Sequence, residues 1–250
     1  ETDILSRLRK ISELDDVLWI AKVREIILNI HENEKIKLFK KFEPFAIMRT
    51  LSDCMDLVVK EIYIRKVGLE VSDISVIAVG GYGRREMSFY SDVDLMFLMG
   101  KSYDPRSDHI SGILHLLWDF HLDIGYSSRT ISEAIKIAKN DVESCTAMMD
   151  GRLLIGDEKV FSDFRKKLNS NRPHGLPEKL NSWRSQRITN NASVQLLEPN
   201  VKESPGALRD IQALQWAIMS KSDLDAVEDR WGDLLDEKDI KTLEEAWKFL

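Results

Sequence analysis

Two aspartates separated by one residue are the first feature of the sequence that could do chemistry. Asp92 and Asp94 open an apolar, strand-like run. Residues i and i+2 of a strand point to the same face, so the two carboxylates are expected to project side by side, with Val93 turned into the core. Adjacent carboxylates repel one another, and a hard dication with oxygen ligands relieves that repulsion. The pair is therefore typical of a Mg²⁺ site that also accepts substrate phosphates.

A glycine-rich segment precedes the aspartate pair. Gly80 and Gly81 end an apolar run, and the ten residues 82–91 separate them from the first aspartate. Glycine lets the backbone approach a polyphosphate closely and offer N–H donors to it. Ser91 and Arg84 could add phosphate contacts. The segment is not a Walker loop, because no Gly-Lys-Ser/Thr follows, and it is not the Gly-x-Gly-x-x-Gly dinucleotide fingerprint.

Short apolar runs predict the strands that position these residues. The β-branched run 74–79 and the run 93–98 indicate two buried strands, and residues 123–130 indicate a third. Apolar residues three and four apart predict helices over 4–68, over 110–118 and again from Ile131 onward. The pattern predicts an α/β fold in which a small mixed sheet is flanked by helical segments.

The chain divides into three expected segments. We expect an N-terminal helical segment at 1–68, a core that carries the site at 69–168 and a helical domain at 169–250, with the boundary in the Asn-, Pro- and Gly-containing loop 169–177. The sequence does not begin with Met and stops inside a helical pattern, so we expect a fragment of a longer protein.

Composition excludes several classes of function. The 250 residues carry 36 Lys and Arg against 42 Asp and Glu, for a net charge of −6, which argues against nucleic-acid binding through a basic surface. No apolar run approaches the length of a membrane span. Cys54 and Cys145 are too few for a disulfide scaffold or a zinc cluster, and we expect buried free thiols in a cytoplasmic protein. The five histidines show no metal-binding pattern.

The glycine pair and the aspartate pair together resemble a known signature. An apolar residue, Gly-Gly, ten residues and Asp-apolar-Asp match the hallmark of the nucleotidyltransferase superfamily that includes DNA polymerase beta. Residues 80–95, 116–130 and 197–212 resemble segments of the GlnD family, the uridylyltransferase and uridylyl-removing enzymes of the signal protein PII. Tyr126 stands where that family usually has His, and Ala207 where it usually has a second Gly.

The resemblance implies a polymerase-beta-like core and a nucleotidyl-transfer reaction. That family moves UMP from UTP onto a tyrosine of PII in nitrogen regulation, and the chain would be the N-terminal part of such an enzyme, with no nucleic-acid or membrane partner. It implies Mg²⁺ held by Asp92 and Asp94, the catalytic residues. The resemblance also implies that Gly80, Gly81 and Ser91 form a phosphate cradle. Arg84, Lys202 or Arg209 would be the nearby cation that offsets the remaining phosphate charge.

Several alternatives remain open at this point. The superfamily's third carboxylate could be Asp119, Asp123 or absent. The Arg209-Asp210 pair could instead be an ion pair or cap that fixes a helix. Transfer of AMP to a protein by the same fold, and a nucleotide-sensing regulatory module without catalysis, are the two other functions consistent with the sequence.

Overall fold

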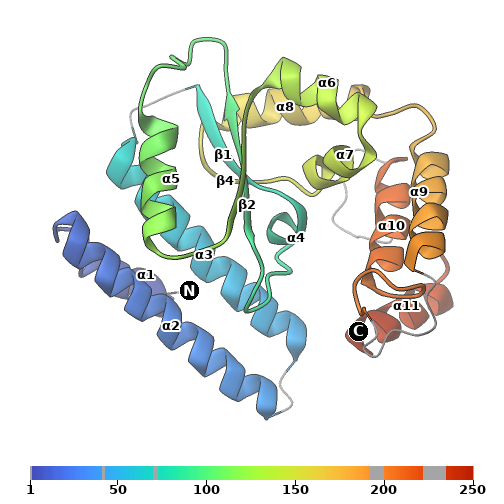
Figure 1. The fold of residues 1–250 in the computed structure, drawn as a ribbon, viewed down its shortest axis with the longest axis horizontal. Coiled ribbons are helices and arrows are strands. Elements are labelled where there is room, and N and C mark those ends of the chain that lie inside the picture. Colours follow the sequence, from blue (N-terminus) through green and yellow to red (C-terminus); the bar gives the residue numbers. More distant parts are fainter. Residues whose placement is uncertain (1, 41–42, 70–72, 192–199, 222–234, 250) are drawn as a thin grey trace. The chain divides into compact units, whose positions relative to one another are not determined.

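The mixed sheet predicted from the sequence is present in the computed structural model, which describes residues 2–40, 43–69, 73–191, 200–221 and 235–249. Its four strands have the order β3-β2-β1-β4 (Figure 1). β1 pairs antiparallel with β2 and β4, whereas β2 pairs parallel with β3. The strands are β1 Ile74–Ala78, β2 Val93–Met99, β3 Ile124–Thr130 and β4 Arg152–Gly156. The first three strands lie within one residue of their predicted bounds.

The fourth strand corrects the sequence prediction, which expected helix throughout the region after Ile131. The run Leu153-Leu154-Ile155 is short and apolar, and such a run does not distinguish a buried strand from a helix by periodicity. The hydrogen-bonded pairing of this run with β1 makes it a strand. Gly156, at the end of β4, has a φ of +107°, and a Cβ there would lie 2.3 Å from the carbonyl oxygen of Ile74. Glycine is therefore required at this end of β4.

Contacts divide the chain into two compact units. The first comprises Glu1–Ala134 and Asp150–Phe164, and the second Ile135–Met149 and Arg165–Leu250. The helices that begin in the first unit are α1 Thr2–Arg9, α2 Asp16–Phe39, α3 Pro44–Lys66, α4 Gly80–Gly83, α5 His109–Asp119, α6 Ile131–Asn140 and α8 Glu158–Ser170. Those of the second are α7 Val142–Met149, α9 Leu176–Asn191, α10 Leu208–Met219 and α11 Glu237–Phe249.

The N-terminal helices and the sheet share one hydrophobic core. α3 buries Val58, Val59 and Ile62 completely, and these residues belong to the same cluster as Phe97 of β2 and Leu117 of α5. The apolar stripes predicted over residues 4–68 are therefore core-facing. The site elements described below rest on α3 through this core.

Both cysteines are buried free thiols, as expected from the sequence. Burial raises the pKa of Cys54 to about 12 and that of Cys145 to about 11. Neither thiol is activated as a nucleophile. Across the described ranges, no helix is both long and apolar enough to cross a membrane.

His31 of α2 contacts the segment that leads to the aspartate pair, and this contact predicts a pH effect. Its ring lies edge-on to Phe89, with 5.9 Å between the ring centroids. Burial, assisted by the charge of Lys35, lowers the pKa of His31 below its ordinary value. The unfolded chain then binds the proton more readily, so acidification through about pH 6.5 should lower the free energy of unfolding.

Urea unfolding on either side of that pH checks the His31 prediction. Between about pH 7.5 and about pH 5.5, the wild-type chain should lose more stability than the His31→Gln variant, which has no imidazole to protonate. Equal losses in the two chains would contradict the prediction.

Candidate functional site

The two aspartates stand where β2 begins. Asp92 is the residue before the strand and is exposed, whereas Asp94 is its second residue and is partly buried. Val93, between them, is 1% exposed and belongs to the core. Val93 is therefore buried as the alternation predicted, and the placement of the two carboxylates side by side stays a prediction.

The Asp94 carboxylate lies between two glycines from other elements. The parallel register pairs Asp94 with Gly125 of β3, and a Cβ built on Gly125 would lie 2.2 Å from Asp94 Oδ1. A Cβ built on Gly80 would lie 3.5 Å from Asp94 Oδ2. The backbone amide of Val79 also donates to the Asp94 carbonyl oxygen, at 3.1 Å. The glycine segment and the third strand thus converge on this carboxylate.

The glycine segment forms a short helix, α4, directly after β1. Gly80 adopts a φ of +59°, which favours glycine, and the amide of Arg84 donates to its carbonyl oxygen at 3.1 Å. The first amides of a helix have no carbonyl partner within it, so those at the start of α4 are suited to anionic oxygens. Gly83 ends α4, and only glycine fits there because a Cβ would lie 2.4 Å from the carbonyl oxygen of Asp150.

An ion pair that the sequence did not indicate holds α4 in place. Arg152 of β4 makes a bidentate contact with Asp56 of α3, with Nη1–Oδ2 and Nη2–Oδ1 distances of 2.5 and 2.9 Å. The same guanidinium donates to the carbonyl oxygens of Tyr82 and Gly83, each at 3.3 Å. Burial, together with Asp56, raises the pKa of the Tyr82 phenol well above its ordinary value. β4 and α3 therefore fix the turn that leads to the aspartate pair.

Arg84 lies behind the glycine turn, paired with two carboxylates. Its Nε donates to Glu86 at 2.7 Å, and its Nη1 donates to Asp150. Burial opposes the charge, but Asp150 and Glu86 outweigh it and raise the pKa of Arg84 above its ordinary value. Its Nη2 lies 3.9 Å from the position of a Cβ on Gly81. In this structure the side chain supports the turn, and its contact with a phosphate stays a prediction.

Ser91 orders the residues directly before Asp92. Its hydroxyl oxygen accepts a hydrogen bond from the Ser88 amide at 2.8 Å and lies 3.0 Å from the Ser88 hydroxyl. The loop therefore enters β2 in a fixed turn, close in sequence to the carboxylates that the resemblance assigns to metal. A phosphate contact of Ser91 stays a prediction.

The other predicted cations lie in the second unit. The Lys202 side chain is exposed, and its amide donates to Asn200 Oδ1 at 3.0 Å. Arg209 pairs with Glu203 at 3.3 Å, and Asp210 accepts from the Gly206 amide at 2.9 Å. Arg209 and Asp210 thus each bind the segment that leads into α10, and a contact of Arg209 with a phosphate stays a prediction. The role of Lys202 toward a phosphate stays a prediction.

The two candidates for a third carboxylate occupy different positions. Asp119 ends α5, and Asp123 directly precedes β3, where its carbonyl oxygen accepts from the Val93 amide at 2.8 Å. Among the described residues, no group of three or more His, Cys, Asp and Glu side chains could hold a metal ion. Mg²⁺ is commonly bound by one or two protein carboxylates, with water and phosphate oxygens completing the coordination. Asp92 and Asp94 fit that donor set.

Comparison with known proteins finds relatives that are named uridylyltransferases. The family model described as GlnD PII-uridylyltransferase matches residues 174–250. The bifunctional uridylyltransferase/uridylyl-removing enzyme of Methylococcus capsulatus is 33% identical over 227 residues, which cover 87% of this chain and 26% of that protein. The enzyme of the same name from Cereibacter sphaeroides is 34% identical over 193 residues, covering 72% of this chain and 20% of that protein.

These alignments bear on the site as well as on the C-terminal region. The Methylococcus alignment leaves out only about an eighth of the chain, so it includes the whole segment from Gly80 to Asp94. The chain spans about a quarter or less of the length of these relatives. The family model and the relatives agree, and we conclude that this chain belongs to the GlnD PII-uridylyltransferase family.

Proposed function

We propose that this chain carries the Mg²⁺-dependent nucleotidyl-transfer site of a PII uridylyltransferase, built on a polymerase-beta-like core. The observation that supports it most is the Asp94 carboxylate, enclosed by Gly80 and Gly125 with Asp92 two residues before it. Two carboxylates beside a glycine turn provide both parts of a site for a metal-bound polyphosphate. The names of the relatives supply the group transferred, a uridylyl group.

Each part of the site has a role in this reaction. Asp92 and Asp94 would hold Mg²⁺, which when bound neutralises charge on the reacting phosphates. The amides at Gly80 and Gly81 would face the leaving phosphates. The tyrosine hydroxyl of PII forms its bond to the α-phosphorus while the bond from that phosphorus to pyrophosphate breaks. The chain's contribution is to orient UTP for this in-line displacement.

A nucleotide-binding module without catalysis is the second candidate. It is favoured by one observation, that within the residues described by the structure no third carboxylate joins a group that could hold a metal ion. Such a module would bind the metal–nucleotide complex at the same two aspartates but would transfer nothing to PII.

Incorporation of labelled UMP into PII distinguishes the two candidates. The chain, Mg²⁺ and UTP should release pyrophosphate and label PII on tyrosine, and ATP in place of UTP should label it poorly. Labelling from ATP instead would assign adenylyl transfer. Binding of the nucleotide with no labelling from either would assign the non-catalytic module.

Gly125 provides a prediction that leaves both aspartates in place. In Gly125→Ala the new Cβ would lie 2.2 Å from Asp94 Oδ1, which is too close for a non-bonded contact, so the carboxylate must turn away from its present direction. Displacing a catalytic group by about 1 Å costs on the order of 100-fold in rate, and we expect UMP transfer to fall by about that factor. Steady-state rates at saturating UTP, measured beside urea unfolding, check this.

Gly112→Ala is the matched control for Gly125→Ala. A Cβ on Gly112, in α5, would lie 3.7 Å from Lys66 Cβ, which is ordinary van der Waals contact. The control should keep its transfer rate and gain a little stability, because alanine favours a helix over glycine by about 1 kcal/mol. Full transfer activity in Gly125→Ala would show that the direction of the Asp94 carboxylate does not matter.

A further inference from the structure

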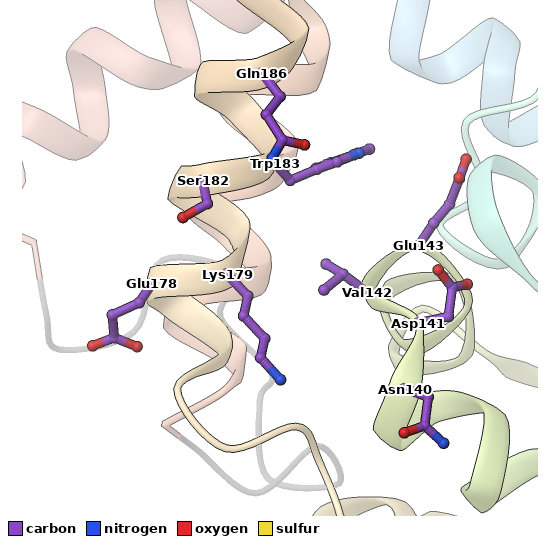
Figure 2. Close-up of a pocket in the computed structure, with 9 residues that line it drawn as sticks. All are labelled: Asn140, Asp141, Val142, Glu143, Glu178, Lys179, Ser182, Trp183 and Gln186. Carbon is purple, nitrogen blue, oxygen red and sulfur yellow. The ribbon is translucent and has the colours of Figure 1, made fainter.

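A pocket of about 440 Å³ lies in the second unit, and none of the residues that line it belongs to the candidate site described above. One wall is formed by residues of α9 at helical spacing, namely Glu178, Lys179, Ser182, Trp183 and Gln186. The other wall is the junction of α6 and α7, residues 140–143. Figure 2 shows Trp183 reaching from α9 toward Glu143. The volume lies within the range of small-molecule sites.

The Trp183 ring is held in place by Arg187 of α9 and by Arg209 and Trp216 of α10. The guanidinium of Arg187 lies 5.2 Å from the ring centroid and that of Arg209 lies 5.8 Å from it, and the Trp216 ring is 6.2 Å away. Arg187 is itself buried and paired with Asp210. The indole is therefore oriented before any ligand arrives, while part of it still lines the pocket. A preoriented aromatic surface binds planar rings with little loss of conformational entropy.

Polar groups complete the lining. Asp141 and Glu143 provide carboxylates, and Gln186 provides an amide. The Asp141 carboxylate is oriented as the cap of α7, because its Oδ2 accepts from the Ser144 amide at 2.7 Å. Carboxylates accept hydrogen bonds from ribose hydroxyls, and an amide can both donate to and accept from a base edge. Lys179 offsets only part of this negative charge, so a triphosphate would be repelled here.

We propose that this pocket binds the base and ribose of a nucleoside, with the base stacked on Trp183 and the ribose hydroxyls bound by Asp141 and Glu143. The assignment of uridine as the nucleoside rests on the proposed function. The pocket's chemistry requires only a planar base with an uncharged sugar attached. Base stacking on an aromatic side chain is sequence-tolerant and strong enough to measure.

Ligand-observed NMR titration of the full chain with uridine tests the proposal. Uridine has no phosphates, so its binding does not depend on Asp92 and Asp94. Trp183→Ala should weaken uridine binding about tenfold, and Trp183→Phe, which keeps a flat ring, should bind within about threefold of wild type. If Trp183→Phe retains uridine binding, the loss in Trp183→Ala is due to lost stacking and not to a loss of folding.

A charge-matched pair of variants tests the opposite wall. Glu143→Gln should weaken uridine binding about threefold, whereas Glu244→Gln should not change it, because Glu244 is an exposed residue of α11 that does not line the pocket. Unchanged affinity in Trp183→Ala and Glu143→Gln would overturn the proposal. Binding of N-acetyl-argininamide in preference to uridine would assign the pocket to a cationic peptide side chain and would overturn it as well. Neither result depends on whether the chain transfers UMP to PII.

Discussion

Asp94→Asn should reduce UMP transfer to PII by about two to four orders of magnitude, with the fold retained. Asparagine has the shape of aspartate, so the space between Gly80 and Gly125 stays filled. It removes the negative charge and the second anionic oxygen that a dication requires. Asp92→Asn should lose activity to a similar degree. The loss should appear in the maximal rate measured at saturating UTP and Mg²⁺.

Asp163→Asn is the control for this loss. Asp163 is exposed on α8, in the part of that helix that belongs to the first unit. The same change of charge there should leave the transfer rate unchanged. If the three variants were equally active, the carboxylates at the start of β2 would not be the catalytic pair.

Arg152→Ala should have the largest effect on stability. The Asp56 side chain is 7% exposed and that of Arg152 22% exposed, so truncating the arginine leaves a nearly buried carboxylate without its bidentate partner. Breaking one side of such a pair costs several kcal/mol, and partial exposure reduces this, so we expect a loss of about 3 kcal/mol in the free energy of unfolding. The turn at Tyr82 and Gly83 also loses two donors, and transfer activity should fall with it.

Two further variants show whether the loss of stability comes from breaking the Arg152–Asp56 ion pair or from removing any arginine. Arg106→Ala removes a side chain that is 92% exposed and paired with Asp104, and it should change the unfolding free energy by less than about 0.5 kcal/mol. The double variant Arg152→Met with Asp56→Leu should recover much of the stability, because it leaves no buried charge unpaired. A single variant no less stable than the double variant would contradict the account. Urea unfolding measures all of them.

Local patterns in the sequence predicted the parts of the site that depend on neighbouring residues. The period-two alternation at Asp92, Val93 and Asp94 is a property of any strand, and the strand is present. Gly80 and Gly81 stand out in the sequence because they follow a buried strand and precede the aspartate pair by ten residues. The structure adds that this turn is a short helix and that Gly80 has a positive φ.

The parts that could not be predicted depend on residues far apart in the sequence. Gly125 carried no signal for contact with Asp94, because that contact arises from the parallel register of β3 on β2. Arg152 and Asp56 are 96 positions apart, and one of them lies on the strand that periodicity did not distinguish from helix. The position of Arg84 beside the glycines predicts a phosphate ligand. Its pairing with Asp150 becomes visible only once β4 is in place.

Binding of Mn²⁺ in the presence of UTP tests most directly whether the carboxylates at the start of β2 form the metal–nucleotide site. Mn²⁺ takes the oxygen ligands that Mg²⁺ takes, and its paramagnetism makes the bound fraction measurable by electron paramagnetic resonance. The wild-type chain and Asp163→Asn should show the same saturable binding, and Asp94→Asn should bind at least about tenfold more weakly. Equal Mn²⁺ affinity in the wild-type chain and Asp94→Asn would contradict the account.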